Sequence, residues 1–585
     1  MTLHDDTSPS LAPTQPSEAR ENAAPSRSGL PYRIRRGDAL AASELGRACG
    51  LGPATAQVLL HRGLDMPDEA RAFLDPKLGG LTPPDSMADR KPAAERLARA
   101  CKRGERVAVF GDYDVDGTTS AAILGDVLEA LGAEVHTFVA NRFEGGYGFS
   151  MPALERVLAC KPTVLVTCDC GSSDHPRVEE ARRRGVDVIV VDHHLVPDEP
   201  LPAVAFLNPH RPDCGFPYKG MCSAGLVFSL GAAIRAELGA RLDLRAWLDL
   251  VALGTVADVA PLDGDNRALV RAGLRLLASD RVRPGVAALK DSARIRRGPM
   301  GAFDIAFRLA PRLNAPGRLA DPTVTLELLR SRDPKEARRL AAQIEQLNDE
   351  RKRIERHTTE EAIAQVEERY GPSPTHGVVA AGHGWHRGVV GISAARLVDR
   401  FDVPAIVIAL EDGMGHGSGR TPEGFHLYEA LAGCSEELER FGGHAAAAGL
   451  TIREERIDVF REAFSARAPR PEAGEALPLV DVELDAAYPL PTVEDLMRLE
   501  PLGEGNAQPV FAIRDAVVEE SRIVADGQHL KLTLRHGRKI LTAFGRDMAH
   551  RIDELGDTVT AIGHLRPDLW RGRGALELSL EKLLS

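Results

Sequence analysis

The sequence predicts an α/β protein in which two α/β lobes are joined by a long helix and followed by a small β-barrel or sandwich. Short β-branched runs alternate with helical segments, a pattern typical of a parallel sheet covered by helices. A charged helical stretch separates these runs from a second set of α/β signals, and strict apolar–polar alternation appears near the C-terminus. The predicted strands of the first sheet are 107–110, 163–166 and 186–191.

The order of these signals divides the chain of 585 residues into five segments. Residues 1–30 are rich in Ser, Pro, Ala and Thr, which predicts a disordered tail. Helix is expected from Asp321-Pro322 with a break at Asp333-Pro334, and Gly371-Pro372 ends it. The C-terminal segment is predicted to be β because 529–534 and 576–581 alternate. The expected segments are a tail at 1–30, a catalytic lobe at 31–320, a connecting helix at 321–370, a second α/β lobe at 371–470, with strands at 377–381 and 404–410, and a β domain at 471–585.

Composition excludes several classes of protein. Hydrophobic residues make up 43% and charged residues 27%, which is ordinary for globular domains. No run approaches the roughly 18 apolar residues of a membrane span, and the N-terminus lacks a secretory pattern, so we expect the cytoplasm. The 8 cysteines form no CxxC pair, which argues against a disulfide framework or a zinc ribbon. With a net charge of −12, any contact with a polyanion requires a local basic patch.

The strongest functional signal is a set of three carboxylates directly after the first predicted strand. Asp112, Asp114 and Asp116 are spaced two apart, so in extended backbone their side chains share one face. Three like charges held this close are costly without a cation. Two alternatives fail: a calcium EF-hand needs Glu where Ile123 stands, and no Gly-Lys-Ser/Thr follows as in a P-loop.

Further ligand types follow the other predicted strands. Asp169 follows the second strand, Asp192-His193-His194 follow the third, and Asp258 follows an apolar helix. A single Asp after a strand is commonly a helix cap, but the joint occurrence at one sheet edge is not explained by capping. Carboxylates with one or two histidines suit two Mn²⁺ or Mg²⁺ ions, the usual machinery for displacement at a phosphate ester. Cys168 and Cys170 point away from Asp169 in a strand, so we favour packing over zinc ligation.

Candidate contacts for a phosphodiester lie in three places. Residues 267–318 hold 12 basic and 3 acidic residues, a balance of +9, which favours nucleic-acid contact over a solvated helix face. Ser418 and His444 are flanked by glycines, which allow backbone N–H groups to approach an anion, although two tight turns explain them equally well. Lys531 lies on the polar face of a C-terminal strand, where a barrel could bind a single strand.

At these residues the sequence resembles the DHH phosphoesterase superfamily, which is known for the Asp192-His193-His194 type of motif. Within it the similarity is strongest to the branch of single-strand-specific 5′-to-3′ DNA exonucleases, and it covers roughly residue 40 to the end. The second lobe resembles the DHH-associated domain, and 501–506 resembles the beginning of the family's oligonucleotide-binding (OB) barrel. The resemblance therefore implies a two-lobed DHH core with a C-terminal OB-type β-barrel. The remaining motifs that carry it are 141–149, 311–318, 384–392, 417–420 and 441–444.

The resemblance also implies residue roles. Asp112, Asp114 and Asp169 would hold one ion. Asp169 would bridge to a second ion, which Asp116, His193 and Asp258 would complete. His194 would lie beside the scissile phosphate, with Asp169 and His194 as the catalytic pair. Cys170 stands where the family often shows Asn. The residues expected to hold the strand and its 5′-phosphate are Arg142, Arg312, Arg318, Ser418, Arg420, His444 and Lys531.

The function that follows is hydrolysis of single-stranded DNA from its 5′ end to 5′-mononucleotides, in DNA repair and recombination, with Mn²⁺ or Mg²⁺. The resemblance alone implies a single-strand-binding protein and a helicase as partners, and a monomer. One alternative is a phosphodiesterase for nanoRNA or cyclic dinucleotides, against which the barrel and the basic run argue. Another is a non-catalytic DNA-binding relative, against which the complete ligand set argues.

Overall fold

The computed structural model describes residues 31–144, 148–295, 298–469, 477–525, 527–568, 571–572 and 574–584. The predicted tail at 1–30 lies outside the described residues. The chain divides into two compact units. One contains residues 77–474 and 501–506; the other contains the residues up to 76, 475–500 and 507–585. Among the described residues, no helix is both long and apolar enough to cross a membrane.

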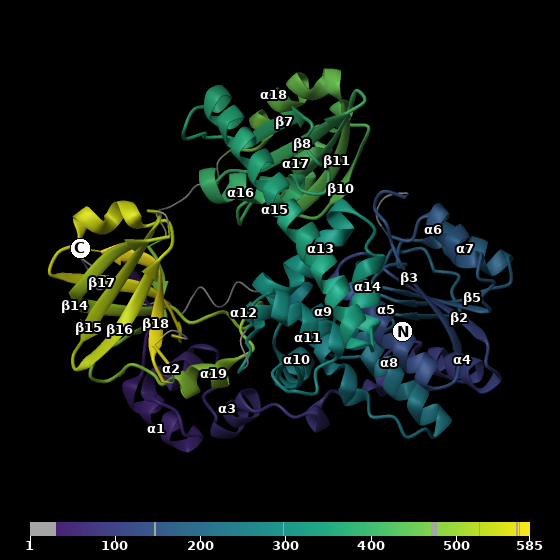
Figure 1. Cartoon of the computed structure of the whole chain (residues 1–585), viewed down its shortest axis with the longest axis horizontal. Helices are drawn as coiled ribbons and strands as arrows, with labels where there is room; N and C mark the ends of the chain where they lie inside the picture. Colours follow the sequence, from purple (N-terminus) through teal and green to yellow (C-terminus); the bar gives the residue numbers. More distant parts are fainter. Residues whose placement is uncertain are drawn as a thin grey trace, which may run out of the picture. The chain divides into compact units, whose positions relative to one another are not determined.

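The first lobe of the larger unit is built on a five-stranded sheet that is parallel throughout, in the order β3-β2-β4-β5-β6 (Figure 1). Its three predicted strands are confirmed, and two more, β3 and β6, lie at its edges. The strands are β2 (Arg106–Gly111), β3 (Glu134–Val139), β4 (Val164–Cys168), β5 (Asp187–Val191) and β6 (Ala205–Leu207).

Helices cover both faces of this sheet, as buried parallel strands require. One core contains apolar side chains of α4, α5, α8 and α9, and the other contains those of α6 and α7. Because the chain leaves β2 for one neighbour and returns on its other side to β4, the topology reverses between β2 and β4. The helices are α4 (Arg90–Arg103), α5 (Val115–Ala130), α6 (Met151–Leu158), α7 (His175–Arg183), α8 (Ser223–Leu238) and α9 (Leu248–Ala257).

The predicted connecting helix is present in two pieces. α14 (Thr323–Arg330) ends before the expected break, and α15 (Pro334–Tyr370) then runs for 37 residues, about 55 Å at 1.5 Å per residue. Asp333 caps α15 through the N–H groups of Lys335 and Glu336. Its first half packs on α11 (Pro284–Ser292) and α13 (Ala310–Leu319), and its second half packs on the second lobe.

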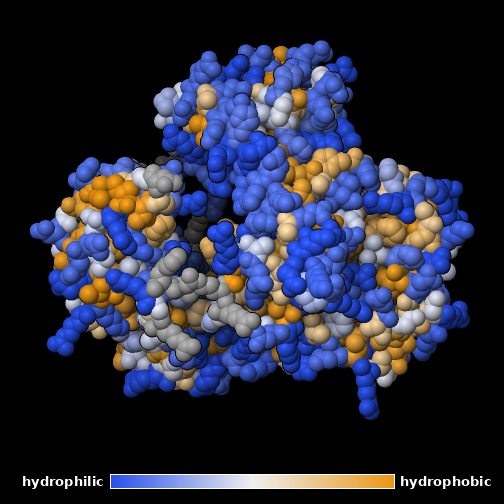
Figure 2. All heavy atoms as spheres, viewed as in Figure 1, coloured by the Kyte–Doolittle hydropathy of each residue, from blue (hydrophilic) through white to orange (hydrophobic). Residues whose placement is uncertain are grey.

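The second lobe is a five-stranded sheet in the order β10-β11-β9-β8-β7, in which only β7 and β8 run parallel. Its apolar residues fill two cores, one on each face, and the surface seen at the top of Figure 2 is mostly hydrophilic. The elements are β7 (Val378–His383), α16 (Val390–Phe401), β8 (Ala405–Glu411), β9 (Met414–Arg420), α17 (Leu427–Ala432), β10 (Arg440–Gly443), β11 (Ala447–Arg453) and α18 (Ile457–Arg467).

The smaller unit is a β-barrel with helices. Its six-stranded sheet runs β13-β14-β15-β16-β18-β17, and a further pairing of β14 with β17 closes it. Leu530, Leu532 and Leu534 of β15 are fully buried, as the alternation predicts. The elements are β12 (Leu479–Val480), β13 (Val482–Glu483), α19 (Val493–Leu499), β14 (Phe511–Val524), β15 (His529–His536), β16 (Lys539–Gly545), β17 (Thr558–Pro567) and β18 (Leu576–Leu584).

The structure groups residues 31–76 with this barrel, whereas the sequence analysis placed them in the catalytic lobe. Strand β1 (Arg33–Ile34) pairs with β12, and Asp495 of α19 accepts a hydrogen bond from the Gly52 N–H at the start of α2 (Pro53–His61). A two-residue strand whose partner lies more than 400 residues away leaves no periodic signal in the sequence. The segment also contains α1 (Ala39–Cys49) and α3 (Pro67–Leu74).

Candidate metal centre

The carboxyl ends of four neighbouring strands lie in register and deliver polar residues to one edge of the first sheet. The paired last residues are Gly111, Cys168, Val191 and Leu207, so the next residues are Asp112, Asp169, Asp192 and Asn208. Open α/β sheets bind ligands at this edge, where the strand order reverses. Here that point lies between Asp112 and Asp169.

Two glycines allow the loop after β2 to fold tightly into α5. A Cβ on Gly117 would lie 2.4 Å from the Asp112 nitrogen, and one on Gly111 would lie 2.2 Å from the Gly117 oxygen. Asp114 caps α5 by accepting a hydrogen bond from the Gly117 N–H at 3.0 Å. The glycines thereby bring Asp112 and Asp114 to the sheet edge, while Asp116 lies inside the first turn of α5.

The N-terminus of α8 holds the Asp116 carboxylate. The N–H groups of Ser223 and Ala224 donate to it at 2.8 and 2.9 Å, and the Cys222 thiol donates at 3.3 Å. A helix N-terminus favours negative charge, and Asp116 is only 1% exposed. The sequence analysis missed this support, because nothing in the pattern places α8 against α5.

Asp169 lies at the centre of the acidic cluster. Its φ of 63° is left-handed, a conformation that Asp tolerates better than most residues. The His193 Nε2 lies 3.1 Å from its Oδ1, and the Ser223 hydroxyl donates to the same oxygen at 3.4 Å. His193 Nε2 also lies 3.7 Å from Asp258 and 3.9 Å from Asp116.

All six predicted metal ligands are brought together around Asp169. Among the described residues there are three groups of potential ligands, and within each group the ligand atoms lie within 4.8 Å of one another. Asp169 belongs to two of these groups, and His193 touches acids of the third. Such a shared carboxylate is what two neighbouring ions require. The groups are Asp112–Asp114–Asp169, Asp169–His193–His194 and Asp116–Cys222–Asp258.

The cluster has the electrostatics of a cation site. Burial and then the Asp114 charge raise the pKa of Asp112 to about 8, and burial and then Asp116 do the same for Asp258. Burial and then the neighbouring acids also raise the pKa of Asp169 well above its ordinary value. Asp112 Oδ1 is buried and accepts no hydrogen bond from the described residues. Hard oxygen ligands with one imidazole fit Mn²⁺ or Mg²⁺.

Asp192 orients His194 and keeps it charged. Its Oδ1 accepts from the N–H groups of His193 and His194 and lies 2.8 Å from His194 Nδ1. This hydrogen bond raises the pKa of His194 to about 9. Asn208, which the sequence analysis missed, donates to the His194 carbonyl at 2.8 Å. His194 is therefore protonated at neutral pH, with its ring half exposed.

The two cysteines beside Asp169 pack in the cores. Cys168 lies in the core with α5 and α8, whereas Cys170 lies in the core on the opposite side. Burial raises the pKa of both thiols well above its usual value, so both stay protonated. Packing is confirmed for both, and neither belongs to a potential ligand group among the described residues.

Arg142 stacks within the first lobe, while the neighbouring Phe143 and Arg318 contact the second lobe. The Arg142 guanidinium lies 4.4 Å from the ring centre of Tyr113, the residue that separates Asp112 from Asp114 in the sequence. The next residue, Phe143, contacts His386 and Arg387 of the loop before α16. Arg318 donates to the Gly388 carbonyl of the same loop at 3.2 Å.

Ser418 and Arg420 lie on strand β9, not in the turn that the glycines suggested, because β8 and β11 pair with it on both sides. Arg420 donates to the Ser418 hydroxyl at 3.0 Å. Both face Gly391 in the first turn of α16, where a Cβ would lie 3.0 Å from Ser418 Oγ. No side chain caps this helix. His444 is exposed in the hairpin between β10 and β11.

The basic run at 267–318 largely serves the fold. Arg267 is 2% exposed and donates to the Pro501 carbonyl. Arg283 binds Asp249, and Arg308 binds Asp304. Arg312 forms a two-pronged salt bridge with Glu345 of α15 at 2.6 and 3.0 Å, which gives it a structural role; its contact with DNA stays a prediction. The charge balance overestimated the unpaired positive charge, because the partners Asp249 and Glu345 lie outside the counted segment. Arg296 and Arg297 lie outside the described residues.

Lys531 belongs to a cross-strand row on the barrel. Register pairs Arg522 with Lys531, Lys531 with Phe544, Phe544 with Ser579, and Ser579 with His564. Paired residues share one face of a sheet. The Arg566 guanidinium lies 6.0 Å from the Phe544 ring centre. We call this set the Lys531 row; it combines cations with an aromatic ring, as single-strand binding requires.

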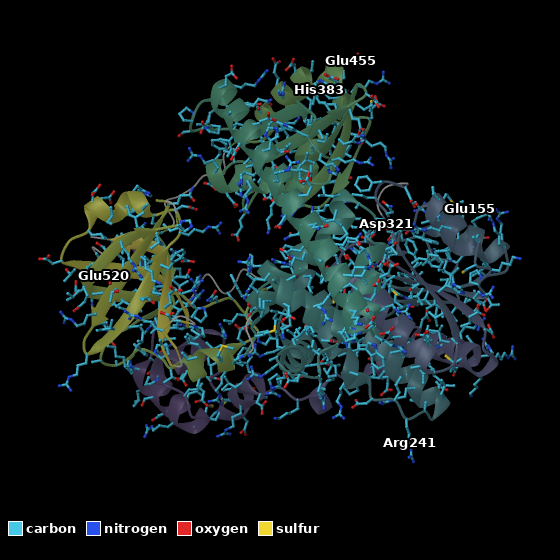
Figure 3. All side chains as sticks on the ribbon, in the orientation of Figure 1. Glu155, Arg241, Asp321, His383, Glu455 and Glu520 are labelled. Atoms are coloured by element: carbon cyan, nitrogen blue, oxygen red, sulfur yellow. The ribbon has the colours of Figure 1, made fainter. Side chains whose placement is uncertain are left out.

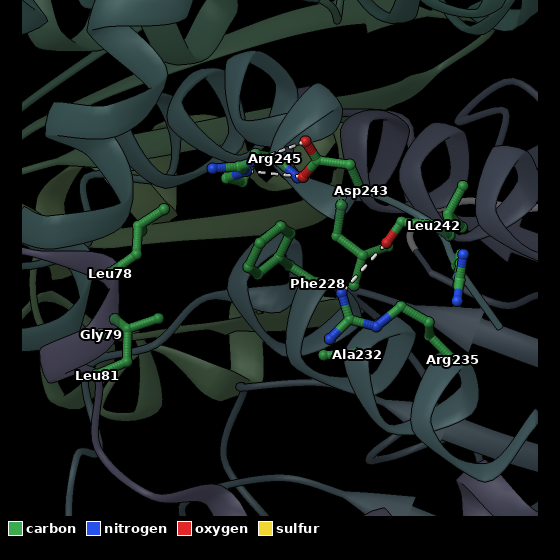
Figure 4. Close-up of a pocket in the computed structure, with 11 residues that line it drawn as sticks. Leu78, Gly79, Leu81, Phe228, Ala232, Arg235, Leu242, Asp243 and Arg245 are labelled. Atoms are coloured by element: carbon green, nitrogen blue, oxygen red, sulfur yellow. Dashed lines mark hydrogen bonds and ion pairs between the residues drawn. The ribbon is translucent and has the colours of Figure 1, made fainter. Parts of the chain in front are cut away.

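A pocket of ≈ 690 Å³ in the first lobe lies apart from the acidic cluster and shares no residue with it (Figure 4). Its walls are mostly apolar, including Leu81 and Phe228. Its one carboxylate, Asp243, is bound through both oxygens by Arg245, and Arg241 projects outward (Figure 3). The pocket therefore offers no metal ligands, and the chemistry lies at the sheet edge.

The raised pKa values predict how the metal-free protein responds to pH. A folded pKa of about 8 at Asp258 contributes stability below the unfolded value near 4, and this stability is lost as pH rises through 8. In EDTA, the melting temperature should therefore fall between pH 5 and 9. Asp258→Asn should reduce this slope and raise the melting temperature at pH 9. Equal slopes in both proteins would show that Asp258 ionises normally.

Comparison with known proteins matches three family models to the described architecture. Residues 106–255 match the DHH family N-terminal domain, residues 375–468 the DHHA1 domain, and residues 480–582 the RecJ OB domain. The expected DHH core, DHH-associated lobe and OB-type barrel are thereby confirmed.

Relatives match over most of the chain. RecJ of Bacillus subtilis, described as a single-stranded-DNA-specific exonuclease, is 34% identical over 95% of this chain and 71% of its own. RecJ of Dickeya dadantii is 38% identical over 88% of this chain and 92% of its own. The structure of Thermus thermophilus RecJ with Mn²⁺ has 31% identity and a TM-score of 0.78, covering 94% of this chain and 79% of its own, and that protein also has a structure with Mg²⁺. The chain therefore belongs to the RecJ family of DHH proteins.

Proposed function

We propose that this protein is a single-stranded-DNA-specific exonuclease that removes 5′-mononucleotides from the 5′ end. The observation that carries the proposal is the shared position of Asp169 between two potential metal groups. The names of the RecJ relatives describe single-stranded-DNA-specific exonucleases, which supports the substrate and the type of reaction. With DNA as the substrate, the enzyme would act in the cytoplasm, in DNA repair and recombination. By the resemblance to the family, it would be a monomer and would work with a single-strand-binding protein and a helicase.

Within this proposal, each residue of the metal centre has a role. Bound Mn²⁺ or Mg²⁺ ions would activate water and neutralise the phosphate. Asp112 and Asp114 would hold one ion, Asp116, His193 and Asp258 would hold the other, and Asp169 would contact both. His194, charged and fixed by Asp192, can donate its Nε2 proton to a phosphate oxygen as negative charge develops. The α8 N-terminus orients Asp116 and offsets part of the cost of burying its charge.

The 5′-to-3′ direction of digestion would be set by the second lobe. The Arg420 guanidinium, the Ser418 hydroxyl and the uncapped N-terminus of α16 converge around Gly391, which suits a terminal phosphate. The loop before α16 contacts Phe143, and the neighbouring Arg142 stacks on Tyr113 between two metal-binding acids. A phosphate site connected this directly to the metal centre would fix the strand by its 5′ end. The Lys531 row would hold more distant nucleotides.

The proposal is tested by Asp169→Asn. The change keeps the shape of the side chain but removes the shared charge, so hydrolysis of single-stranded DNA should fall by more than the roughly 100-fold typical of outer ligands. The rate of nucleotide release from 5′-labelled oligonucleotides with Mn²⁺ measures this. Asp187→Asn, the same change at the opposite edge of the sheet, should keep the rate. A variant at position 169 within a few-fold of wild type would rule out a shared ion ligand.

Arg420→Ala should slow digestion of 5′-phosphorylated strands, and Arg420→Lys should restore only part of the rate, because an ammonium cannot bind two phosphate oxygens in one plane. The measurement compares 5′-phosphate with 5′-hydroxyl substrates. Arg440→Ala on β10, which is separated from β9 by β11 in the same sheet, serves as the control. If wild type shows no preference for the phosphate, or the Arg420→Ala variant keeps the full preference, the phosphate site lies elsewhere.

Lys531→Glu should weaken binding of long single strands and lower the slope of log K against log salt by about 0.7 for each lost phosphate contact. Cleavage of dinucleotides should stay unchanged, because all the predicted metal ligands belong to the other unit. Titrations with labelled oligonucleotides at several salt concentrations measure the slope. Lys582→Glu on β18, outside the Lys531 row, is the matched control. Equal slopes of log K against log salt for wild type and Lys531→Glu would show that the Lys531 row does not contact the DNA.

A further inference from the structure

The residue after Asp258 has an unusual backbone for its type. Helix α9 ends in a Schellman motif: the Ala260 N–H donates to the Thr255 carbonyl at 3.2 Å, and the Val259 N–H donates to the Val256 carbonyl at 3.3 Å. This motif places Val259 at φ 60°, the position where helices usually have glycine. Among the described non-glycine residues with positive φ, Val259 is the only β-branched one.

Burial does not compensate this strain. The Val259 side chain is 65% exposed, so the core gains little from it. Glycine or asparagine would form the same motif with less strain. Strained residues cluster at functional sites, and the preceding residue, Asp258, lies 3.7 Å from His193. Leu195, the residue after His194, is also exposed, at 73%.

We propose that Val259 contacts the deoxyribose of the nucleotide at the scissile phosphate and selects DNA over RNA, an inference that rests on the proposed exonuclease function. A small branched aliphatic side chain offers no hydrogen bond to phosphate and no flat surface for a base. It fits the C–H surface of a sugar. In DNA the C2′ atom carries only hydrogen, whereas in RNA its hydroxyl would lose water against the Val259 methyl groups without gaining a partner.

The exposure of Val259 limits how strongly it can discriminate DNA from RNA. Enclosed hydrophobic pockets reject an added hydroxyl by roughly 100-fold. Because Val259 is 65% exposed, its discrimination should be smaller, about tenfold, in kcat/KM. The substrates are 5′-phosphorylated oligonucleotides that are all DNA or carry one ribonucleotide at the scissile position.

The test uses the full chain with Val259→Gly and Val259→Asn. Both should melt at or above the wild-type temperature in EDTA, because the strain is relieved. Both should reduce the DNA-to-ribonucleotide ratio of kcat/KM several-fold, with Asn reducing it most because its amide can pair with the 2′-hydroxyl. Lys161→Gly is the control: Lys161 has φ 52° and is exposed near the opposite end of β4, so the change relieves similar strain but should leave the ratio unchanged.

Three outcomes overturn the inference while leaving the exonuclease assignment intact: a wild-type ratio near one, variants that keep the wild-type ratio, or variants that melt well below wild type. If wild type hydrolyses neither substrate, the proposed function itself fails.

Discussion

The structure depends on holding four largely buried carboxylates and a histidine in one cluster at the carboxyl ends of the first sheet's strands. Burial, and after it the neighbouring acids, raise the pKa of Asp112, Asp116, Asp169 and Asp258, so holding these groups as charged carboxylates is costly. Three features of the fold offset this cost. The register of the strands fixes the positions, Gly117 allows the tight approach after β2, and the α8 N-terminus neutralises Asp116. Two cations would complete the balance.

The same constraint explains the arrangement around the cluster. Among the described residues, Asp192 belongs to no potential ligand group. It is buried, and its carboxylate oxygens form hydrogen bonds with the Ser172 N–H and with His194 Nδ1. Asp192 therefore orients the proton donor His194, while His193 contacts the acids expected to bind the ions. Tyr113, between Asp112 and Asp114, carries Arg142, and Phe143 beside Arg142 meets the second lobe. These contacts link the acidic cluster to the loop before α16 through Tyr113, Arg142 and Phe143.

Local patterns predicted the parts of this site that follow strands. Asp112, Asp169 and His193 follow runs whose β-branched composition identifies them, and the sheet topology requires their convergence. Cys222, Ser223 and Asn208 were missed because they act through tertiary contacts with Asp116, Asp169 and His194. The grouping of residues 31–76 with the barrel was missed for the same reason. Arg312 shows what a charge count leaves out: the count over 267–318 identifies the cation but not Glu345 of α15, the carboxylate that binds it.

The central claim is that this cluster is built for two ions that share Asp169. Equilibrium dialysis of the full chain against Mn²⁺ at pH 7, with proton release followed in weak buffer, tests it directly. The account predicts two bound ions per chain and release of protons, because acids whose pKa is near 8 must ionise to bind metal. Asp169→Asn should lose most of this binding. A single ion per chain in the wild type, or binding without proton release, would contradict the account.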